Sequence, residues 1–147
     1  MAFHPNRKWA YAVNELSSTV TLIKKMDSGT YALDASISTL PKNYTEESSC
    51  ADIRISPDGQ FVYASNRGHD SIAIYKVNPK NGTLVLVGHE STRGKVPRNF
   101  SLSPDGNFLI VANQKSNSLV SFERNKINGT LKFVDEIDAP TPVCILF

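Results

Sequence analysis

Residues 56–67 have the sequence Ser-Pro-Asp-Gly-Gln-Phe-Val-Tyr-Ala-Ser-Asn-Arg, and residues 103–114 repeat it as Ser-Pro-Asp-Gly-Asn-Phe-Leu-Ile-Val-Ala-Asn-Gln. A looser copy, His-Pro-Asn-Arg-Lys-Trp-Ala-Tyr-Ala-Val-Asn-Glu, occupies residues 4–15. The three prolines lie 52 and 47 residues apart. Asn-Gly-Thr-Leu recurs at residues 81–84 and 128–131, each time 24 residues after the proline of its own unit. A repeat that keeps one phase fixes the architecture before any single residue is interpreted.

Each unit is predicted to consist of strands and turns, because no segment has the length and period of a helix. In the second unit, apolar runs cover residues 51–55, 61–65, 71–77 and 84–88. Ser-Pro-Asp-Gly favours a tight turn between the first two runs, and Asn-Gly favours a hairpin before the last. The sequence therefore predicts four short antiparallel strands per unit, here called a to d.

Four-stranded units at this period are typical of the blades of an all-β protein, the β-propeller. The alternative is a β-sandwich, which does not usually repeat one internal phrase at one phase. We place the units at residues 1–50, 51–97 and 98–141, followed by residues 142–147 as strand a of a further blade. A closed propeller needs four to eight blades. Three blades resemble a fragment, and their uncovered faces predict self-association or pairing with missing N-terminal blades.

Composition excludes several classes of function. The chain is 40% apolar and 20% charged, and its net charge of +2 is too small to favour nucleic acid or an anionic membrane surface. No apolar run reaches the length of a membrane span and no signal peptide follows Met1, so we expect a cytoplasmic location. No glycine-rich phosphate loop, zinc spacing or nucleophile elbow is present, and we expect no metal and no cofactor. Cys50 and Cys144 are predicted to be free thiols.

Four segments resemble a known family: residues 12–21, residues 55–59 together with 63–72, residues 111–114, and residues 142–147. They are similar to the C-terminal part of the seven-bladed lactonase propellers, which include the propeller-type 6-phosphogluconolactonases and the fungal carboxy-muconate cyclases. The resemblance covers nearly all of this chain but less than half of a typical member. It implies a seven-bladed parent protein that opens or forms lactone rings without a metal.

Topology independently predicts which polar side chains share a surface. In an antiparallel blade, the start of strand a, the end of strand b and the start of strand c lie at one edge, here called the top edge. The Ser-Pro-Asp-Gly and Asn-Gly turns lie at the opposite, bottom edge. Charged and amide side chains recur at the top edge of all three units, which favours a binding site there. They are Asn14, Glu15, Asp52, Asn66, Arg67, His69, Arg98, Asn113 and Gln114.

Three of these residues are candidates for catalysis. Glu15 is predicted to act as a general acid or base on a lactone, or alternatively to form an ion pair with Arg67 of the neighbouring blade. Arg67 can hold a substrate carboxylate or phosphate, or stabilise the oxyanion that develops at the lactone carbonyl. His69 titrates near neutral pH and can move a proton, but a solvated turn residue is an equally ordinary role for it.

The remaining candidates are predicted to bind substrate. Arg98, at the start of a strand a, can contact an anion. Asn14, Asn66, Asn113 and Gln114 are assigned to substrate binding as well, although hydrogen bonds to the backbone of the b-to-c turns also suit them. Asp52 is expected to be a structural acceptor. Arg54 stands where many bacterial members of the family carry a histidine, and its side chain is expected to face either the channel or a blade interface.

The sequence thus predicts a fragment of a lactonase that hydrolyses a sugar lactone such as 6-phosphogluconolactone, with a small lactone as its partner. Because half of the pocket wall would come from other blades, we expect the fragment to be inactive alone. Two alternatives remain open: a non-catalytic propeller scaffold that binds a ligand or protein on its top face, and a muconate-type lactonising cyclase.

Overall fold

A tight turn joins the first two strands of each unit. Ser56 Oγ donates to Asp58 Oδ1 at 2.5 Å and accepts the N–H of Phe61 at 3.0 Å, and the third unit repeats this arrangement from Ser103. Gly59 has a φ of +71°, a left-handed backbone that glycine adopts without steric cost. In the first unit Arg7 occupies the glycine position with a φ of +57°. The turn therefore keeps its shape even where its sequence departs from the repeat.

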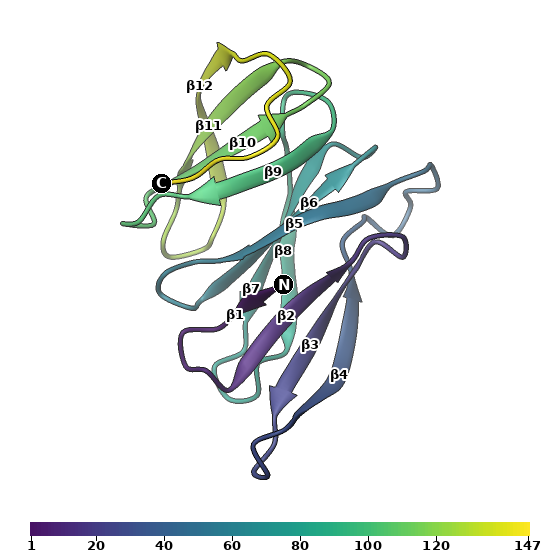
Figure 1. Ribbon diagram of the computed structural model, residues 1–147, viewed down its shortest axis with the longest axis vertical. Helices are drawn as coiled ribbons and strands as arrows, with labels where there is room; N and C mark the ends of the chain where they lie inside the picture. The colour runs from purple at the N-terminus through teal and green to yellow at the C-terminus, as the bar shows by residue number, and fades with distance from the viewer.

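The computed structural model describes residues 1–147 as twelve strands in three separate sheets, without a helix (Figure 1). Blade 1 contains β1 (Ala2–Phe3), β2 (Trp9–Asn14), β3 (Thr19–Lys25) and β4 (Tyr31–Ser38). Blade 2 contains β5 (Ser49–Ile55), β6 (Phe61–Arg67), β7 (Ser71–Val77) and β8 (Leu84–Ser91). Blade 3 contains β9 (Pro97–Leu102), β10 (Phe108–Asn113), β11 (Ser118–Arg124) and β12 (Leu131–Asp138). Every neighbouring pair is antiparallel, which confirms the predicted all-β fold of four-stranded blades.

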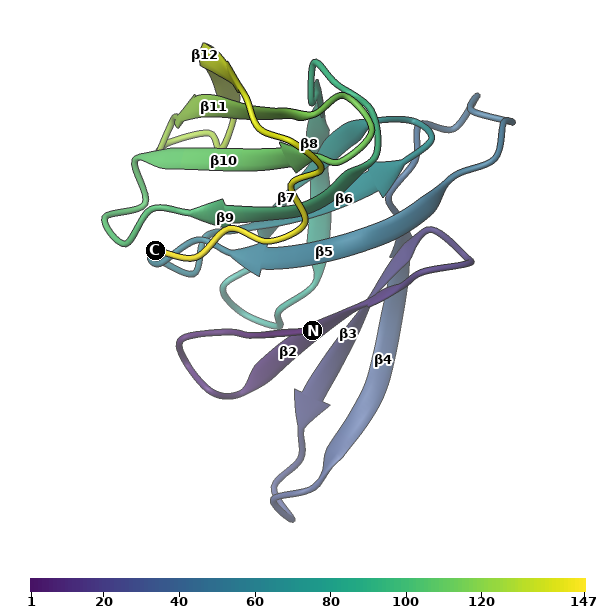
Figure 2. The same ribbon diagram turned by 45° about the horizontal axis from the view of Figure 1, so that its top comes forward.

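The three blades pack face to face in chain order, with blade 2 in the middle (Figure 2). Successive residues of β6 alternate between two cores: Val62 and Ala64 pack towards blade 1, whereas Phe61 and Tyr63 pack towards blade 3. The two central strands of the middle blade, β6 and β7, are buried on both faces, so apolar residues occupy both sides of each strand. Consequently the strict apolar and polar alternation of a half-exposed strand is absent from residues 71–77.

A buried arginine fastens the bottom edge of blade 3 to blade 2. Arg124 Nη2 donates to Asp58 Oδ2 at 2.7 Å, Nε to the Tyr63 hydroxyl at 3.0 Å, and Nη1 to the Gly106 carbonyl at 3.1 Å. Burial alone would raise the pKa of Asp58, but the hydrogen bonds from Arg124 and Ser56 hold it below its usual value. Burial raises the pKa of Tyr63 to about 12, although Arg124 opposes this rise.

Residues 142–147 were predicted to form a strand, and they do not, because no neighbouring strand of this chain pairs with them. The segment runs beside β9 (Figure 1), where the N–H of Ile145 donates to Asn99 Oδ1 at 2.7 Å. The N–H of Phe100 makes the corresponding contact with Asp52 Oδ2 at 3.4 Å, one blade earlier. The segment therefore occupies the place of a strand a without the ladder of hydrogen bonds that defines one.

Both cysteines are free: Cys50 is buried in β5, and Cys144 is exposed in the C-terminal segment. Strand β5 begins at Ser49, so Cys50 lies in the strand rather than in the preceding loop. The structure contains no helix with the length and apolarity needed to cross a membrane.

Candidate functional site

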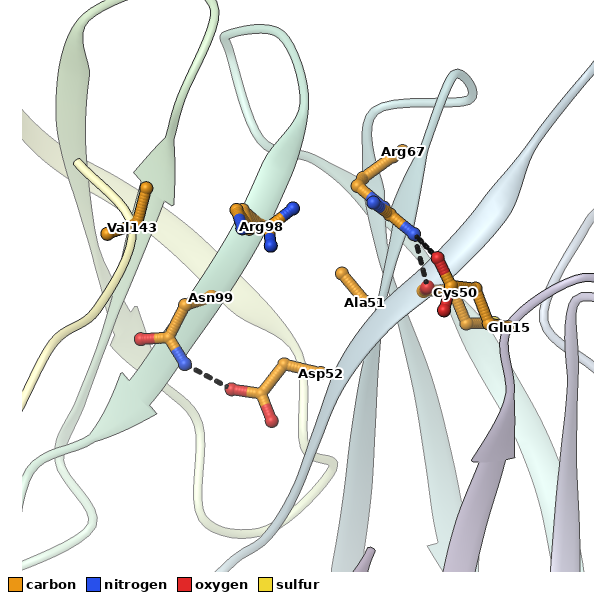
Figure 3. A pocket seen from close by; sticks show the side chains of 8 residues that line it. All are labelled: Glu15, Cys50, Ala51, Asp52, Arg67, Arg98, Asn99 and Val143. Atoms are coloured by element: carbon orange, nitrogen blue, oxygen red, sulfur yellow. Dashed lines mark hydrogen bonds and ion pairs between the residues drawn. The ribbon is translucent and has the colours of Figure 1, made fainter. Parts of the chain in front are cut away.

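A polar pocket of about 250 Å³ opens at the top edge of the blades, between β5 and β9. Figure 3 shows side chains from all three blades around it, together with one from the C-terminal segment. Glu15 follows β2, Arg67 ends β6, and Arg98 lies near the start of β9. The residues that line the pocket are Glu15, Cys50, Ala51, Asp52, Arg67, Arg98, Asn99 and Val143.

Glu15 and Arg67 form an ion pair across the junction of blades 1 and 2 (Figure 3). Arg67 Nη2 contacts Glu15 Oε1 and also donates to the Cys50 carbonyl at 3.0 Å. The Glu15 carbonyl in turn accepts the N–H of Cys50 at 3.0 Å. The Glu15 side chain is 62% exposed and that of Arg67 only 19% exposed. The arginine is thus fixed by the protein, while the carboxylate stays open to water.

The loop before β5 packs against the backbone of Arg67 and Gly68. Ser48 Oγ donates to the Arg67 carbonyl at 3.0 Å. Gly68 has a φ of +104°, and a Cβ there would lie 2.3 Å from the Glu47 carbonyl oxygen. Only glycine permits this close approach without a shift of the backbone. Arg67 Nε is buried and has no hydrogen-bond partner, so one donor of the fixed guanidinium is unused.

Arg98 is the free cation of the pocket. It is exposed and makes no hydrogen bond or ion pair, whereas both carboxylates beside it are already engaged. Asp52 accepts hydrogen bonds from Asn99 Nδ2 at 2.7 Å and from the N–H of Ile53 at 2.8 Å, which fits the structural role predicted for it. The pocket therefore offers one unpaired guanidinium to an anionic ligand.

Four of the predicted substrate-binding residues lie outside this pocket. Asn66 and Asn113 are buried and donate to the carbonyls that follow the outer strands of the preceding blades, those of Thr39 and Thr92, each at 2.8 Å. Asn14 donates to two threonine hydroxyls of its own blade. The backbone N–H of Gln114 donates to the Val96 carbonyl at 3.0 Å. The predicted hydrogen bonds to the backbone of the b-to-c turns are not the ones observed, because Asn66 and Asn113 reach the preceding blade and Asn14 reaches threonine side chains.

His69 also lies outside the pocket. Its ring packs edge-on against Tyr44 and His89, with centroids 4.7 and 5.7 Å away, and its Nδ1 is 2.6 Å from Ser71 Oγ. Burial and the nearby His89 lower its pKa, although Asp70 opposes this shift. The structure therefore places this imidazole in the wall between blades 1 and 2 rather than beside Glu15.

Sequence reasoning missed four residues that line the pocket: Cys50, Ala51, Asn99 and Val143. The repeat contained a signal for two of them, because Asn99 and Val143 occupy the strand a register of Asp52 and Arg98, respectively.

Arg54 faces a blade interface, where its Nε donates to the Phe100 carbonyl at 3.1 Å. No cluster of three metal-ligating side chains is present. Because the Arg98 guanidinium is unpaired and the Glu15 carboxylate is exposed, the pocket is suited to an anion beside a water-accessible carboxylate.

Comparison with known proteins gives a consistent result over the whole chain. A family model described as "Lactonase, 7-bladed beta-propeller" matches residues 1–147. A 6-phosphogluconolactonase of Bacillus subtilis is 41% identical over 101 residues, 68% of this chain and 29% of the relative. A 6-phosphogluconolactonase of Formosa agariphila is 47% identical over 102 residues, 68% of this chain and 28% of the relative.

Solved structures agree with this result. A protein from Lactobacillus plantarum superposes with a TM-score of 0.93 at 33% identity, over 97% of this chain and 42% of its own. A periplasmic gluconolactonase of Pseudomonas aeruginosa superposes with a TM-score of 0.91 at 28% identity, over 97% of this chain and 40% of its own. This chain therefore spans less than half of the length of these relatives.

Proposed function

Because this chain belongs to the lactonase family of seven-bladed β-propellers, we propose that its top-edge pocket is part of a site that hydrolyses a sugar lactone. The observation that supports this proposal is the water-accessible carboxylate of Glu15 beside two arginines, one fixed and one free. Ester hydrolysis needs a base for water and positive charge for the developing oxyanion. Glu15, Arg67 and Arg98 supply both.

In this proposal Glu15 acts as the general base. It takes a proton from a water molecule while the water oxygen bonds to the lactone carbonyl carbon. The carbonyl oxygen becomes an oxyanion, which Arg67 stabilises through guanidinium hydrogens that Glu15 and Cys50 do not use. The ring C–O bond then breaks, and the leaving alkoxide takes the proton from Glu15. A muconate-type cyclase would need a different step, in which a substrate carboxylate oxygen adds to a carbon–carbon double bond while an acid delivers a proton to the neighbouring carbon.

We assign Arg98 to the negative group of the substrate, a phosphate or a carboxylate. Its guanidinium is unpaired, and an arginine fork matches either anion with two parallel hydrogen bonds. The relatives named as 6-phosphogluconolactonases suggest a phosphorylated sugar lactone such as 6-phosphogluconolactone. His69 stays a prediction without a place in this mechanism, because it does not line the pocket.

The three blades supply only part of such a site. Since the chain spans about 30% of its curated relatives, we propose that it binds the anion but needs further blades for turnover. A cytoplasmic location also stays a proposal, because one structural relative is described as periplasmic.

Isothermal titration with 6-phosphogluconate, the hydrolysis product, tests this assignment. Arg98→Gln should weaken binding about 10- to 100-fold, the value of a charge-assisted pair. Arg7→Gln is the matched control, because it removes the same charge from the bottom edge, and it should leave the affinity unchanged. Equal losses of affinity in both variants would show that only the net charge of the chain matters. No binding at all by the unaltered chain would refute an anion site in this pocket.

A further inference from the structure

Arg98 lies in a β-bulge at the start of β9. Asn99 opposes Ala112 of β10. Pro97 opposes the next residue, Asn113, so Arg98 is an extra residue without a partner in the ladder. Bulges redirect side chains and often lie beside active sites. Because the Arg98 guanidinium is itself unpaired, its position depends on the segment that precedes it in the chain, residues 92–96.

This segment, which connects β8 to β9, ends in a strained residue. Val96 has a φ of +59°, a left-handed conformation that a β-branched residue rarely adopts. Such a conformation persists only where the surrounding structure imposes it. Two hydrogen bonds do so here. The N–H of Val96 donates to Asp70 Oδ1 at 2.9 Å, and its carbonyl accepts the N–H of Gln114 at 3.0 Å.

Asp70 contacts the segments that carry both arginines. It lies in the turn between β6 and β7. Besides the N–H of Val96, its Oδ1 accepts the N–H of Gly68, the residue after Arg67, at 3.2 Å. The Asp70 carbonyl accepts the N–H and the hydroxyl of Thr92, each at 3.0 Å. One residue thus joins the end of β6 to both ends of the segment that leads into the bulge.

The corresponding turn of blade 3 makes the same contacts with a neutral side chain. Asn117 has the place of Asp70 and nearly the same φ, +54° against +52°. Its Oδ1 accepts the N–H of Thr141 at 2.9 Å, and its carbonyl accepts the N–H of Ala139 at 2.8 Å. Thr141 corresponds to Val96 in this contact and is also left-handed, with a φ of +46°. The contact therefore requires an acceptor oxygen at this position rather than a negative charge.

We propose that Asp70 is a positioning residue, which sets the separation of the Arg67 and Arg98 guanidinium groups. It does not line the pocket and forms no ion pair, so it acts on a ligand only through the segments that it joins. The inference rests on the proposed function, in which Arg98 holds the anionic group and Arg67 the lactone carbonyl oxygen. A ligand that spans both arginines depends on their separation, whereas an ion held by Arg98 alone does not.

Isothermal titration with 6-phosphogluconate and with inorganic phosphate tests this role. Asp70→Ala should weaken the binding of 6-phosphogluconate about tenfold, which is within the range for one charge-assisted hydrogen bond. It should leave the affinity for inorganic phosphate, which needs only Arg98, unchanged. Asp70→Asn keeps an acceptor oxygen, as Asn117 does in blade 3, and should recover most of the lost affinity.

Asp105→Ala is the matched control. Asp105 also accepts a backbone N–H within a turn, that of Asn107 at 3.0 Å, but its turn lies at the bottom edge. The variant removes the same charge as Asp70→Ala and should change neither affinity. Circular dichroism on each variant shows whether a loss of binding is a loss of fold.

Hydrogen exchange at the Val96 amide follows the contact without a ligand. Asp70→Ala leaves this N–H without its acceptor, so its exchange should become at least about tenfold faster. Asp70→Asn should keep the exchange slow. An exchange rate that Asp70→Ala leaves unchanged would show that Asp70 does not hold the segment, and it would overturn the inference.

The titrations separate this inference from the proposed function. Binding of 6-phosphogluconate that Asp70→Ala leaves unchanged would overturn the role of Asp70 and leave the anion site standing. Equal losses of affinity for both ligands would show that Asp70 only supports the fold, which also overturns the inference. An unaltered chain that binds neither ligand would refute the anion site itself, and with it any role of Asp70 in binding.

Discussion

Replacement of Gly129 by alanine measures how closely two blades pack. A Cβ at residue 129 would lie 2.3 and 2.5 Å from two ring carbons of Phe61, whose side chain is fully buried. The left-handed backbone, with a φ of +79°, costs a residue with a Cβ about 1–2 kcal/mol. Overpacking of the buried ring adds about 1–3 kcal/mol. We therefore expect Gly129→Ala to lower the free energy of unfolding by about 2–5 kcal/mol.

Gly29→Ala is the matched control, because its φ of +86° carries the same backbone cost while no atom lies within 4 Å. It should cost only about 1–2 kcal/mol. Both variants are compared by urea unfolding, followed by circular dichroism. If the two substitutions destabilise the protein equally, within about 0.5 kcal/mol, the close glycine contact contributes nothing and the packing argument fails.

Three further predictions concern single side chains. Arg7→Gly should raise the free energy of unfolding by about 1 kcal/mol in urea titrations, because it relieves a left-handed backbone with a φ of +57°; no gain would contradict the strain. Arg124→Met should cost about 2–3 kcal/mol in the same assay, because it leaves the partly buried Asp58 carboxylate without its charged donor, and a neutral result would show that water replaces the arginine. Burial and His89 lower the pKa of His69, so the unfolded chain binds more protons near pH 6.5 and stability should fall as the pH drops from 7 to 5. His69→Asn should flatten that dependence in unfolding midpoints, whereas an unchanged slope would assign it to other groups.

The repeat predicted the strands well because each blade contains its own turn chemistry. Ser56 and Gly59 fix the turn between strands a and b, and this local signal needs no knowledge of neighbouring blades. Residues 142–147 show the limit of the same reasoning. Their sequence matches a strand a, but a strand also needs a partner, and no strand of this chain supplies one.

The candidate site was predictable only in part. The sequence placed Glu15, Arg67 and Arg98 on one edge, because residues at one phase of a repeat meet at one place. It did not distinguish them from Asn66 and Asn113, which share that phase but turn into the blade junctions. The position of a residue within the repeat predicts the edge of the blade at which that residue lies. The direction of each side chain depends on packing against the neighbouring blade, which the sequence pattern does not encode.

The central claim, that the pocket at the top edge binds the anionic group of a lactone, is tested most directly by amide chemical-shift mapping. The nitrogen-15-labelled chain is titrated with 6-phosphogluconate and, in parallel, with gluconate. The account predicts that shifts cluster at Glu15, Arg67, Arg98 and their neighbours, and that gluconate gives weaker ones because it lacks the phosphate. Shifts that cluster instead at the bottom edge around His4 and Trp9, or the absence of any cluster, would contradict it.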